Sequence, residues 1–293
     1  MHKIYLDHNS TTPVLKEVLD VMLPFYKDSF GNPSSIHSEG RAARVCLDEA
    51  REQVAELIGA RSSEIVFTSG GSESNNFAIL GVALALNSKK RHIVTCEVEH
   101  AAILNPLKQL EALGFHVDYL PVDNVGRVDP KKVKDALKDS TCLVTIQHAN
   151  SEVGTLQNIK EIGSLIKNND ILFHTDAVQS VGKLAVNVND ISVDLLSMSS
   201  HKIYGPKGVG ALFVKRGTPA LFSPVCGGGQ EKKRRGGTEN VPGIVGFGKA
   251  CKIALDRINK GNLNQLKVMR DLLRNKIERL IPNVDFYGCI KNG

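Results

Sequence analysis

Hydrophobic residues recur along the first part of the chain with a helical period. Between residues 38 and 59 they stand three or four residues apart, which is the spacing of one face of an α-helix. The positions are Ala43, Leu47, Ala50, Val54, Leu57 and Ile58. Gly59 follows directly, and because glycine commonly ends a helix, we expect an amphipathic helix over residues 38–59.

Short apolar runs rich in β-branched residues come next, separated by further helical patterns. The runs lie at residues 65–67, 92–95, 117–120, 143–146, 171–173 and 194–197, and the helical patterns lie near 74–87, 101–113, 130–138 and 159–168. Short strands that alternate with helices are typical of a mostly parallel sheet sandwiched by helices. The sequence therefore predicts an α/β fold.

The last part of the chain predicts a second, smaller unit. A long helix is expected from about residue 263, ended by Pro282, and residues 284–287 are expected to form one strand of a further sheet. A single strand cannot form a domain, so we expect an incomplete smaller α+β domain. The predicted division is a large domain over residues 14–257 and a truncated small domain made of residues 1–13 and 258–293.

Polar residues follow the ends of several predicted strands. These clusters are residues 68–72, 99–100, 147–150, 174–176 and 199–202. Ligands of such sheets bind outside the carboxyl ends of the strands. The clusters therefore predict one common site.

Composition and charge exclude several classes of protein. Apolar residues make up 42% of the 293 residues and charged residues 23%, as in ordinary globular proteins, and the net charge is +6. The N-terminal residues contain no apolar signal core and no arginine-rich leader, which favours a cytoplasmic protein without membrane association. The basic run at 232–235 has no interleaved aromatic residues, so nucleic acid is not expected as a partner.

The six cysteines are scattered, and no two of them form a C-x-x-C pair. This spacing argues against a disulfide framework and against a zinc site, so no metal is expected.

Two residues after strand ends carry the candidate chemistry. Lys202 stands between an apolar run and a Gly/Pro turn. Partial burial beside other cations lowers the pKa of a lysine and makes its amine a nucleophile, which suits a Schiff base with pyridoxal phosphate. Asp176 follows its own strand, and a buried carboxylate there suits the protonated pyridine nitrogen of that cofactor. The alternative role for Asp176 is an N-cap for a helix that starts at Ala177.

A candidate phosphate cradle lies between a predicted strand and a predicted helix. Gly70, Gly71, Ser72 and Glu73 would present backbone amides and a hydroxyl to a single phosphate, and they match neither nucleotide-binding glycine motif. An ordinary capped turn is the alternative. His100 would stack on the cofactor ring and move protons near neutral pH, or would serve as a structural residue.

Together these residues resemble the cysteine desulfurases of the NifS/IscS group, which are class-V aminotransferase-like enzymes of fold-type I. The matching stretches are residues 5–13, 30–35, 67–76, 99–100, 174–179, 200–208, 227–231 and 235–242. The likeness runs from residue 3 to about residue 290.

The resemblance implies pyridoxal 5′-phosphate as cofactor and assigns catalytic roles to Lys202 and His100. Lys202 would form the Schiff base and later shuttle protons, while His100 stacks on the ring. The implied cofactor-binding residues are Gly71, Ser72, His100, Asn150, Asp176, Gln179, Ser199, His201, Lys202 and Thr238.

Within that set, the resemblance implies a specific contact for each residue. Asp176 would pair with the ring nitrogen, Gln179 with the ring hydroxyl, and Asn150 would lie near that hydroxyl and the substrate carboxylate. The implied phosphate ligands are Gly71, Ser72, Ser199 and His201. Thr238 would reach the phosphate from a second subunit, which implies a homodimer.

The resemblance also implies the reaction. L-cysteine would be converted to L-alanine, and its sulfur would be left as a persulfide on an enzyme cysteine and passed to an iron–sulfur scaffold protein. The protein would then be a sulfurtransferase of iron–sulfur cluster assembly and sulfur metabolism.

The sequence departs from the family pattern near its C-terminus. The family's catalytic cysteine lies in a loop of the type S-S-G-S-A-C, and none of the six cysteines matches it; the family's substrate-carboxylate arginine is not found either. Asn150-Ser151-Glu152 replaces the usual Asn-Asn-Glu, with little expected effect. We therefore expect a truncated chain that releases little or no sulfide. Two alternatives stay open, a selenocysteine lyase and a catalytically silent cofactor-binding or scaffold protein.

Overall fold

One sheet forms the centre of the computed structural model, which describes residues 4–86, 90–167, 170–261 and 263–289. Its strands within these ranges are β1 (Ile65–Thr68), β2 (His92–Cys96), β3 (His116–Leu120), β4 (Thr141–Thr145), β5 (Leu172–Asp176), β6 (Leu195–Ser199) and β7 (Gly210–Val214). Their order across the sheet is β1-β7-β6-β5-β4-β2-β3. Strands β6, β5, β4, β2 and β3 run parallel, whereas β7 is antiparallel to both of its neighbours.

The six strands predicted from the sequence are all present, and the predicted α/β fold is confirmed. Strand β7 was not predicted. It begins at Gly210, soon after the turn that follows Lys202, where the glycines of the sequence indicate a turn rather than a strand. A Cβ atom at residue 210 would lie 2.6 Å from the Met198 carbonyl oxygen, so only glycine lets this strand enter the sheet so closely.

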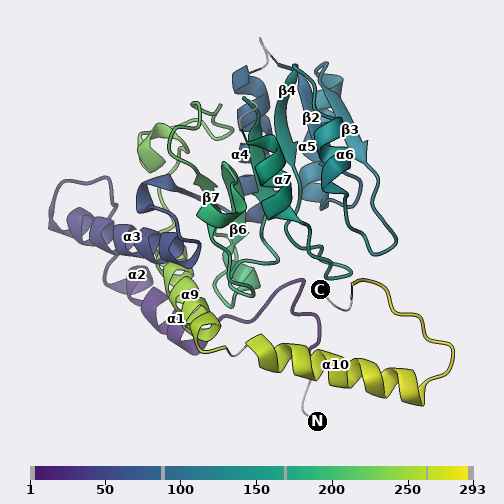
Figure 1. Ribbon diagram of the computed structural model, residues 1–293. Helices are drawn as coiled ribbons and strands as arrows, with labels where there is room; N and C mark the ends of the chain where they lie inside the picture. The colour runs from purple at the N-terminus through teal and green to yellow at the C-terminus, as the bar shows by residue number, and fades with distance from the viewer. Residues whose placement is uncertain (1–3, 87–89, 168–169, 262, 290–293) are drawn as a thin grey trace.

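Helices lie on both faces of the sheet (Figure 1), and short 3₁₀ turns lie before β1, after β6 and before α9. The helices are α1 (Lys16–Met22), α2 (Pro24–Lys27), α3 (Ser38–Leu57), α4 (Gly71–Leu86), α5 (Ala101–Ala112), α6 (Pro130–Asp135), α7 (Ile159–Ile166), α8 (Val188–Ile191), α9 (Val241–Asn259) and α10 (Leu263–Leu280). The 3₁₀ turns are η1 (Ser62–Glu64), η2 (Ser200–Lys202) and η3 (Gln230–Lys233). Within the part of the chain that the structure describes, no helix has both the length and the apolar composition needed to cross a bilayer.

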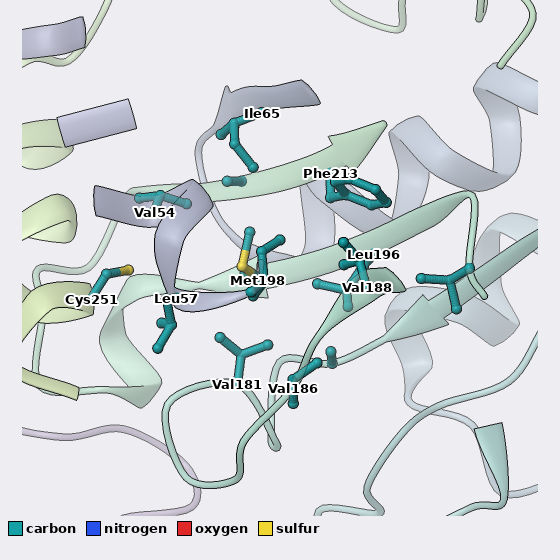
Figure 2. Packing of buried hydrophobic residues seen from close by; sticks show 14 of the residues in the cluster. Val54, Leu57, Ile65, Val181, Val186, Val188, Leu196, Met198, Phe213 and Cys251 are labelled. Atoms are coloured by element: carbon teal, nitrogen blue, oxygen red, sulfur yellow. The ribbon is translucent and has the colours of Figure 1, made fainter. Parts of the chain in front are cut away.

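Both faces of the sheet are buried, because side chains of each strand alternate between two hydrophobic cores. Ile65 and Phe67 of β1 belong to one core, together with residues of α3, α7 and α9. Val66, which lies between them, belongs to the other core, together with residues of α4 and α5. Figure 2 shows part of the first core, where Val54 of α3 and Met198 of β6 belong to the same cluster. This double covering explains why the strands read as continuous apolar runs.

A buried ion pair fastens the glycine-rich segment 227–237 to the sheet. Both Arg51 guanidinium Nη atoms donate to the Glu231 carboxylate at 2.7 Å, and the Phe67 backbone N–H donates to the same carboxylate at 2.9 Å. Glu231, Lys232 and Lys233 have φ angles of 46°, 57° and 66°, a left-handed run that non-glycine residues rarely adopt. The ion pair therefore holds a strained turn in place, and with it the residues that lead to Thr238.

The C-terminal region differs from its prediction. Helix α10 forms as expected and projects away from the sheet (Figure 1), with Leu266, Met269 and Leu273 all more than half exposed. The strand predicted over residues 284–287 was wrong, because that segment is irregular. A strand needs a partner for its backbone hydrogen bonds, and the described residues provide none; instead the Phe286 ring lies under the Arg274 guanidinium at 4.3 Å. The domain division at residues 13 and 257 stays a prediction.

Candidate active site

A cavity of about 270 Å³ lies at the carboxyl ends of β5 and β6, beside the N-terminus of α4. Eight of the ten residues predicted to bind a cofactor line it, namely Gly71, Ser72, His100, Asp176, Gln179, Ser199, His201 and Lys202. Ser10, Asn75, Gln147 and Ser151 also contribute to the wall. The polar clusters at the strand ends therefore converge, as the topology of a parallel sheet requires.

The carboxylate of Asp176 is buried at the end of β5. The Asn75 side-chain amide donates to its Oδ2 at 2.7 Å, and the Val178 backbone N–H donates to its Oδ1 at 3.0 Å. Burial raises the pKa of Asp176 above its ordinary value. Among the described residues, no basic side chain lies within 4 Å of this carboxylate. No helix starts at Ala177, so the alternative N-cap role has no helix to serve.

Lys202 ends η2, and its amine lies on the cavity wall. Its Nζ donates to the backbone carbonyls of Asn9 and Ser10, the latter at 3.0 Å. The partners are neutral, and burial lowers the pKa of Lys202, although the charge of Asp176 opposes that shift. A lysine with a lowered pKa is a better nucleophile at neutral pH.

The segment that accepts these hydrogen bonds is tied to the turn after Lys202. The Thr12 hydroxyl donates to the His201 carbonyl at 2.9 Å and accepts the Tyr204 backbone N–H at 2.9 Å. Tyr204 has a φ angle of 66°, so the turn leaves the strand direction sharply. The N-terminal segment thus forms one wall of the site and orients the lysine.

Lys183 is a second half-buried lysine that sequence reasoning missed. Its Nζ donates to Gln179 Oε1 at 2.9 Å and to Asn9 Oδ1 at 3.3 Å. Burial, aided by the positive charge of Lys202, lowers its pKa to about 8. Lys183 does not line the cavity. The sequence signal that could have identified Lys183 is its position four residues after Gln179, one of the implied cofactor-binding residues.

One end of the cavity is arranged for an anion. Helix α4 begins at Gly71 and Ser72, and unpaired backbone N–H groups at a helix start favour negative charge. The Ser199 hydroxyl is buried and has no hydrogen-bond partner among the described residues. A Cβ atom on Gly71 would lie 2.7 Å from Val178 Cγ2, so glycine is needed for this close approach. His201 also lines this site, and burial lowers its pKa.

His100 and Gln179 both line the cavity, and each side chain already forms a hydrogen bond within the protein. His100 is the N-cap of α5, and its Nδ1 accepts the Ala102 backbone N–H at 3.0 Å, which fixes the ring orientation. The Gln179 amide donates to the Asn9 carbonyl at 3.0 Å. This arrangement leaves the face of the His100 ring available for stacking against a flat ligand.

Asn150 and Thr238 do not line the cavity of this chain. The Asn150 amide donates to the Val98 carbonyl at 3.1 Å, and its oxygen accepts the backbone N–H groups of Glu152 and Val153. Asn150 therefore stabilises its own turn. Thr238 lies exposed in the segment that follows the Arg51–Glu231 ion pair. Their roles at the cofactor stay predictions.

Glu99 is a buried acid behind the cavity that sequence reasoning did not single out. Its Oε1 accepts the Gln147 backbone N–H at 2.7 Å and the Cys96 thiol at 3.1 Å, while its Oε2 has no described partner. Burial raises the pKa of Glu99 to about 8, and the negative charge of Asp176 adds to the shift. Glu99 thus connects the ends of β2 and β4 as a carboxylic acid rather than a carboxylate at neutral pH.

The six cysteines differ in burial. Cys96, Cys142 and Cys251 are buried, and burial raises the pKa of each thiol. Cys226 is exposed in the glycine-rich segment, and Cys289 is half-buried. Within the described ranges, no cysteine lines the cavity.

The arrangement suits a flat, cationic ring that carries an anionic group. A buried carboxylate without a basic partner, an unpartnered buried hydroxyl beside a helix N-terminus and an amine of lowered pKa all face one cavity. Each of these groups is costly to bury unless a ligand satisfies it.

Comparisons with known proteins give consistent matches. The family model described as Aminotransferase class-V matches residues 4–292. The cysteine desulfurase IscS of Dictyoglomus turgidum is 52% identical over 290 residues, which cover 99% of this chain and 73% of the relative. A solved NifS-like protein has a TM-score of 0.92 and 39% identity, covering 96% of this chain and 77% of its own. A structure of SspA in complex with cysteine has a TM-score of 0.83 and 46% identity, covering 85% and 72%.

The burial of Glu99 predicts a pH-dependent stability. Between about pH 5 and pH 8 the folded protein keeps the Glu99 proton while the unfolded chain, with an ordinary glutamate pKa of 4.5, has lost it. The folded state then binds more protons, so the free energy of unfolding falls as pH rises through this window. In Glu99→Gln the free energy of unfolding should fall by about 3–5 kcal/mol less than in wild type over this pH window.

Urea unfolding of wild type and variant across this pH range measures the effect. Glu97→Gln, an exposed position two residues away, serves as the matched control and should keep the wild-type slope. An identical slope in Glu99→Gln and wild type would show that this carboxyl titrates alike in both states.

Proposed function

The chain belongs to the class-V aminotransferase family, and from that premise we propose that it acts as a pyridoxal-phosphate-dependent cysteine desulfurase on L-cysteine. The family and the cofactor predicted from the sequence are confirmed by the matches to cysteine desulfurase IscS and to the NifS-like structure. The similar SspA structure is a complex with cysteine, which supports the proposed substrate class.

The observation that carries this proposal is the pairing of Lys202 and Asp176 on one cavity. Pyridoxal phosphate, when bound, supplies an electron sink for the electrons released at the substrate Cα. Lys202 would hold its aldehyde carbon, and Asp176 would face the ring nitrogen and keep it protonated. A bound cationic nitrogen would also favour the charged form of the Asp176 carboxylate, whose pKa burial otherwise raises.

The remaining wall residues would bind and orient the cofactor. The amides at Gly71 and Ser72, the Ser199 hydroxyl and His201 would hold the phosphate, and the unpartnered Ser199 hydroxyl would then gain an acceptor. His100 would stack on the ring, since its Nδ1 is already fixed at the start of α5. Gln179 would donate to the ring hydroxyl through the second hydrogen of its side-chain amide, since the first donates to the Asn9 carbonyl.

Proton transfer in this site would depend on Lys202 and His100. Lys202 must release the Asn9 and Ser10 carbonyls before its amine can enter the cavity. Once released by the substrate amine, the Lys202 amine would move a proton at the substrate Cα. Its lowered pKa favours the neutral amine that a general base requires.

Asn150 would contact the substrate only after its turn rearranges. Its amide nitrogen and oxygen are both engaged by backbone groups of residues 98 and 152–153. The proposed role near the ring hydroxyl and the substrate carboxylate therefore requires these hydrogen bonds to open or to be shared.

A homodimer would complete the site. Thr238 is exposed and follows a strained turn that the buried Arg51–Glu231 pair holds in place. Arg235 of the same segment forms an ion pair with Glu73 of α4 at 2.8 Å. These contacts hold the segment against its own chain, and Thr238, which does not line its own cavity, would reach the phosphate of the partner subunit.

Two finer points of function have alternatives. A selenocysteine lyase would use the same pocket, and relative turnover of cysteine and selenocysteine distinguishes the two activities. A silent cofactor-binding or scaffold protein would hold pyridoxal phosphate without forming alanine. The iron–sulfur scaffold protein as sulfur acceptor and the cytoplasmic location stay predictions from the sequence.

The first test of the proposal is the loss of Lys202. Wild-type protein should be yellow, and Lys202→Ala should lose the visible band on dialysis, because the covalent link to the cofactor is gone. Lys183→Ala is the matched control, since Lys183 also has a lowered pKa but does not line the cavity, and it should stay yellow. A Lys202→Ala protein that keeps its colour after dialysis would refute the assignment.

A second test concerns Thr238 and the dimer. Thr238→Ala should weaken cofactor binding about 10- to 150-fold, which corresponds to one lost hydrogen bond to a charged group. Co-expression of Thr238→Ala and Lys202→Ala chains should give a heterodimer with one site that contains both native residues. At a cofactor concentration that fills only native sites, the heterodimer should show about half of the wild-type band. A heterodimer with no band would mean that Thr238 acts within its own chain.

A third test concerns sulfur release. The expectation that this chain releases little or no sulfide stays a prediction, and it is measured by incubating the cofactor-loaded protein with L-cysteine and a reductant. Sulfide release at a rate typical of the family would mean that one of the six cysteines accepts the sulfur.

A further inference from the structure

Two histidines and an aspartate meet at the amino-terminal ends of β2 and β3, at the end of the sheet away from the cavity. His92 and His116 are the first residues of these strands and are direct neighbours in the parallel register. Their rings stack with centroids 5.4 Å apart. Asp118 lies two residues after His116 and therefore projects from the same face of β3.

The spacing of these three side chains suits a single metal ion. His92 Nε2 lies 3.0 Å from one Asp118 carboxylate oxygen, and His116 Nε2 lies 3.0 Å from the other. One ligand atom from each residue falls within 4.8 Å of the other two. Tetrahedral zinc with bonds near 2.0–2.1 Å places its ligand atoms about 3.3 Å apart. The two nitrogen–oxygen distances of 3.0 Å are close to that spacing.

His92 is already held in the orientation that a ligand needs. The residue is 1% exposed, and its Nδ1 lies 2.8 Å from the Thr141 hydroxyl. That hydroxyl also accepts the Lys138 backbone N–H at 2.8 Å, which fixes its position. A hydrogen-bond partner on one ring nitrogen of a histidine commonly supports metal binding through the other nitrogen.

In the structure, the cation that contacts Asp118 and His92 is the Lys138 ammonium group. Its Nζ lies 2.8 Å from Asp118 Oδ2 and 3.3 Å from His92 Nε2. A neutral His92 cannot satisfy both neighbours: a proton on Nε2 suits Asp118 and opposes the ammonium, while a lone pair on Nε2 suits Lys138 and opposes the carboxylate. The Lys138 side chain is 46% exposed, so it is free to turn outward.

We propose that His92, His116 and Asp118 form a binding site for a divalent transition metal of the zinc type, with Lys138 displaced into solvent and water as the remaining ligand. Two imidazoles and one carboxylate match Zn²⁺, Co²⁺ and Ni²⁺ better than Mg²⁺ or Ca²⁺, which prefer oxygen ligands. The His116 side chain is 68% exposed, which gives an ion access from solvent.

The bound ion would cross-link an edge strand to its neighbour. Strand β3 is the last strand of the sheet in the described residues, and the strand it pairs with is β2. Metal ligands on both strands would oppose their separation, so the metal should stabilise the folded state by mass action. The cysteine spacing argued against a zinc site. That argument does not bear on this cluster, because its ligands are two histidines and an aspartate and include no cysteine.

Titration of the full chain, loaded with pyridoxal phosphate and stripped of metal, with zinc chloride alone tests the site. Calorimetry should show a zinc site whose affinity falls at least about 10-fold in the exposed-position variant His116→Ala. Lys138→Met should strengthen binding by about two- to fivefold or more, because a competing ion pair is removed. Zinc should raise the Tm of wild type and of Lys138→Met, but not of His116→Ala.

The control variant is Cys226→Ser, which removes the exposed thiol and should leave this binding unchanged. Two results would overturn the proposal. One is a wild-type protein that binds no zinc at millimolar concentration, and the other is equal zinc affinity and Tm shift in wild type and His116→Ala.

Discussion

The buried carboxylate of Asp176 is the constraint around which the site is organised. It ends a central strand and receives hydrogen bonds from an amide and a backbone N–H, but no basic side chain reaches it among the described residues. Burial of this carboxylate costs free energy and raises its pKa, and the charges of His100 and Lys202 offset that rise only in part. A ligand with a positively charged ring nitrogen removes the cost. The same carboxylate would make that ring a better electron acceptor, so the stability of the complex and the chemistry depend on one contact.

The sheet, α4, the N-terminal segment and the Arg51–Glu231 pair position the other residues of the site around that carboxylate. The sheet, buried on both faces, brings Asp176 and Ser199 to one edge, and α4 points its N-terminus at the same place. The N-terminal segment closes the site through Thr12 and accepts the Lys202 amine through the carbonyls of residues 9 and 10. The Arg51–Glu231 pair acts at a distance, because it holds the strained turn that precedes Thr238. Thr12 and the Arg51–Glu231 pair are buried, whereas Asn9 and Ser10 are exposed.

Much of this was predictable from the sequence, since apolar periodicity identified six strands and the polar residues after them identified the cavity. The features that the sequence did not predict depend on contacts between residues that lie far apart in the chain. Strand β7 was missed because its glycines resembled a turn, and the strand expected at residues 284–287 did not form because a strand requires a partner. Glu99 and Lys183 acquire unusual pKa values through burial and through the charges of Asp176 and Lys202, which the fold brings close to them. His92 and His116 meet only through the register of β2 and β3.

The most direct measurement of the central claim is chemical trapping of the cofactor on the folded protein. Borohydride reduction of the loaded chain, followed by proteolysis and mass spectrometry of the peptides, identifies the lysine that holds the aldehyde carbon. The cavity geometry predicts the reduced cofactor on Lys202, at the wall that also carries Asp176. Attachment to Lys183, the other lysine whose pKa burial lowers, or the absence of any attachment, would contradict it.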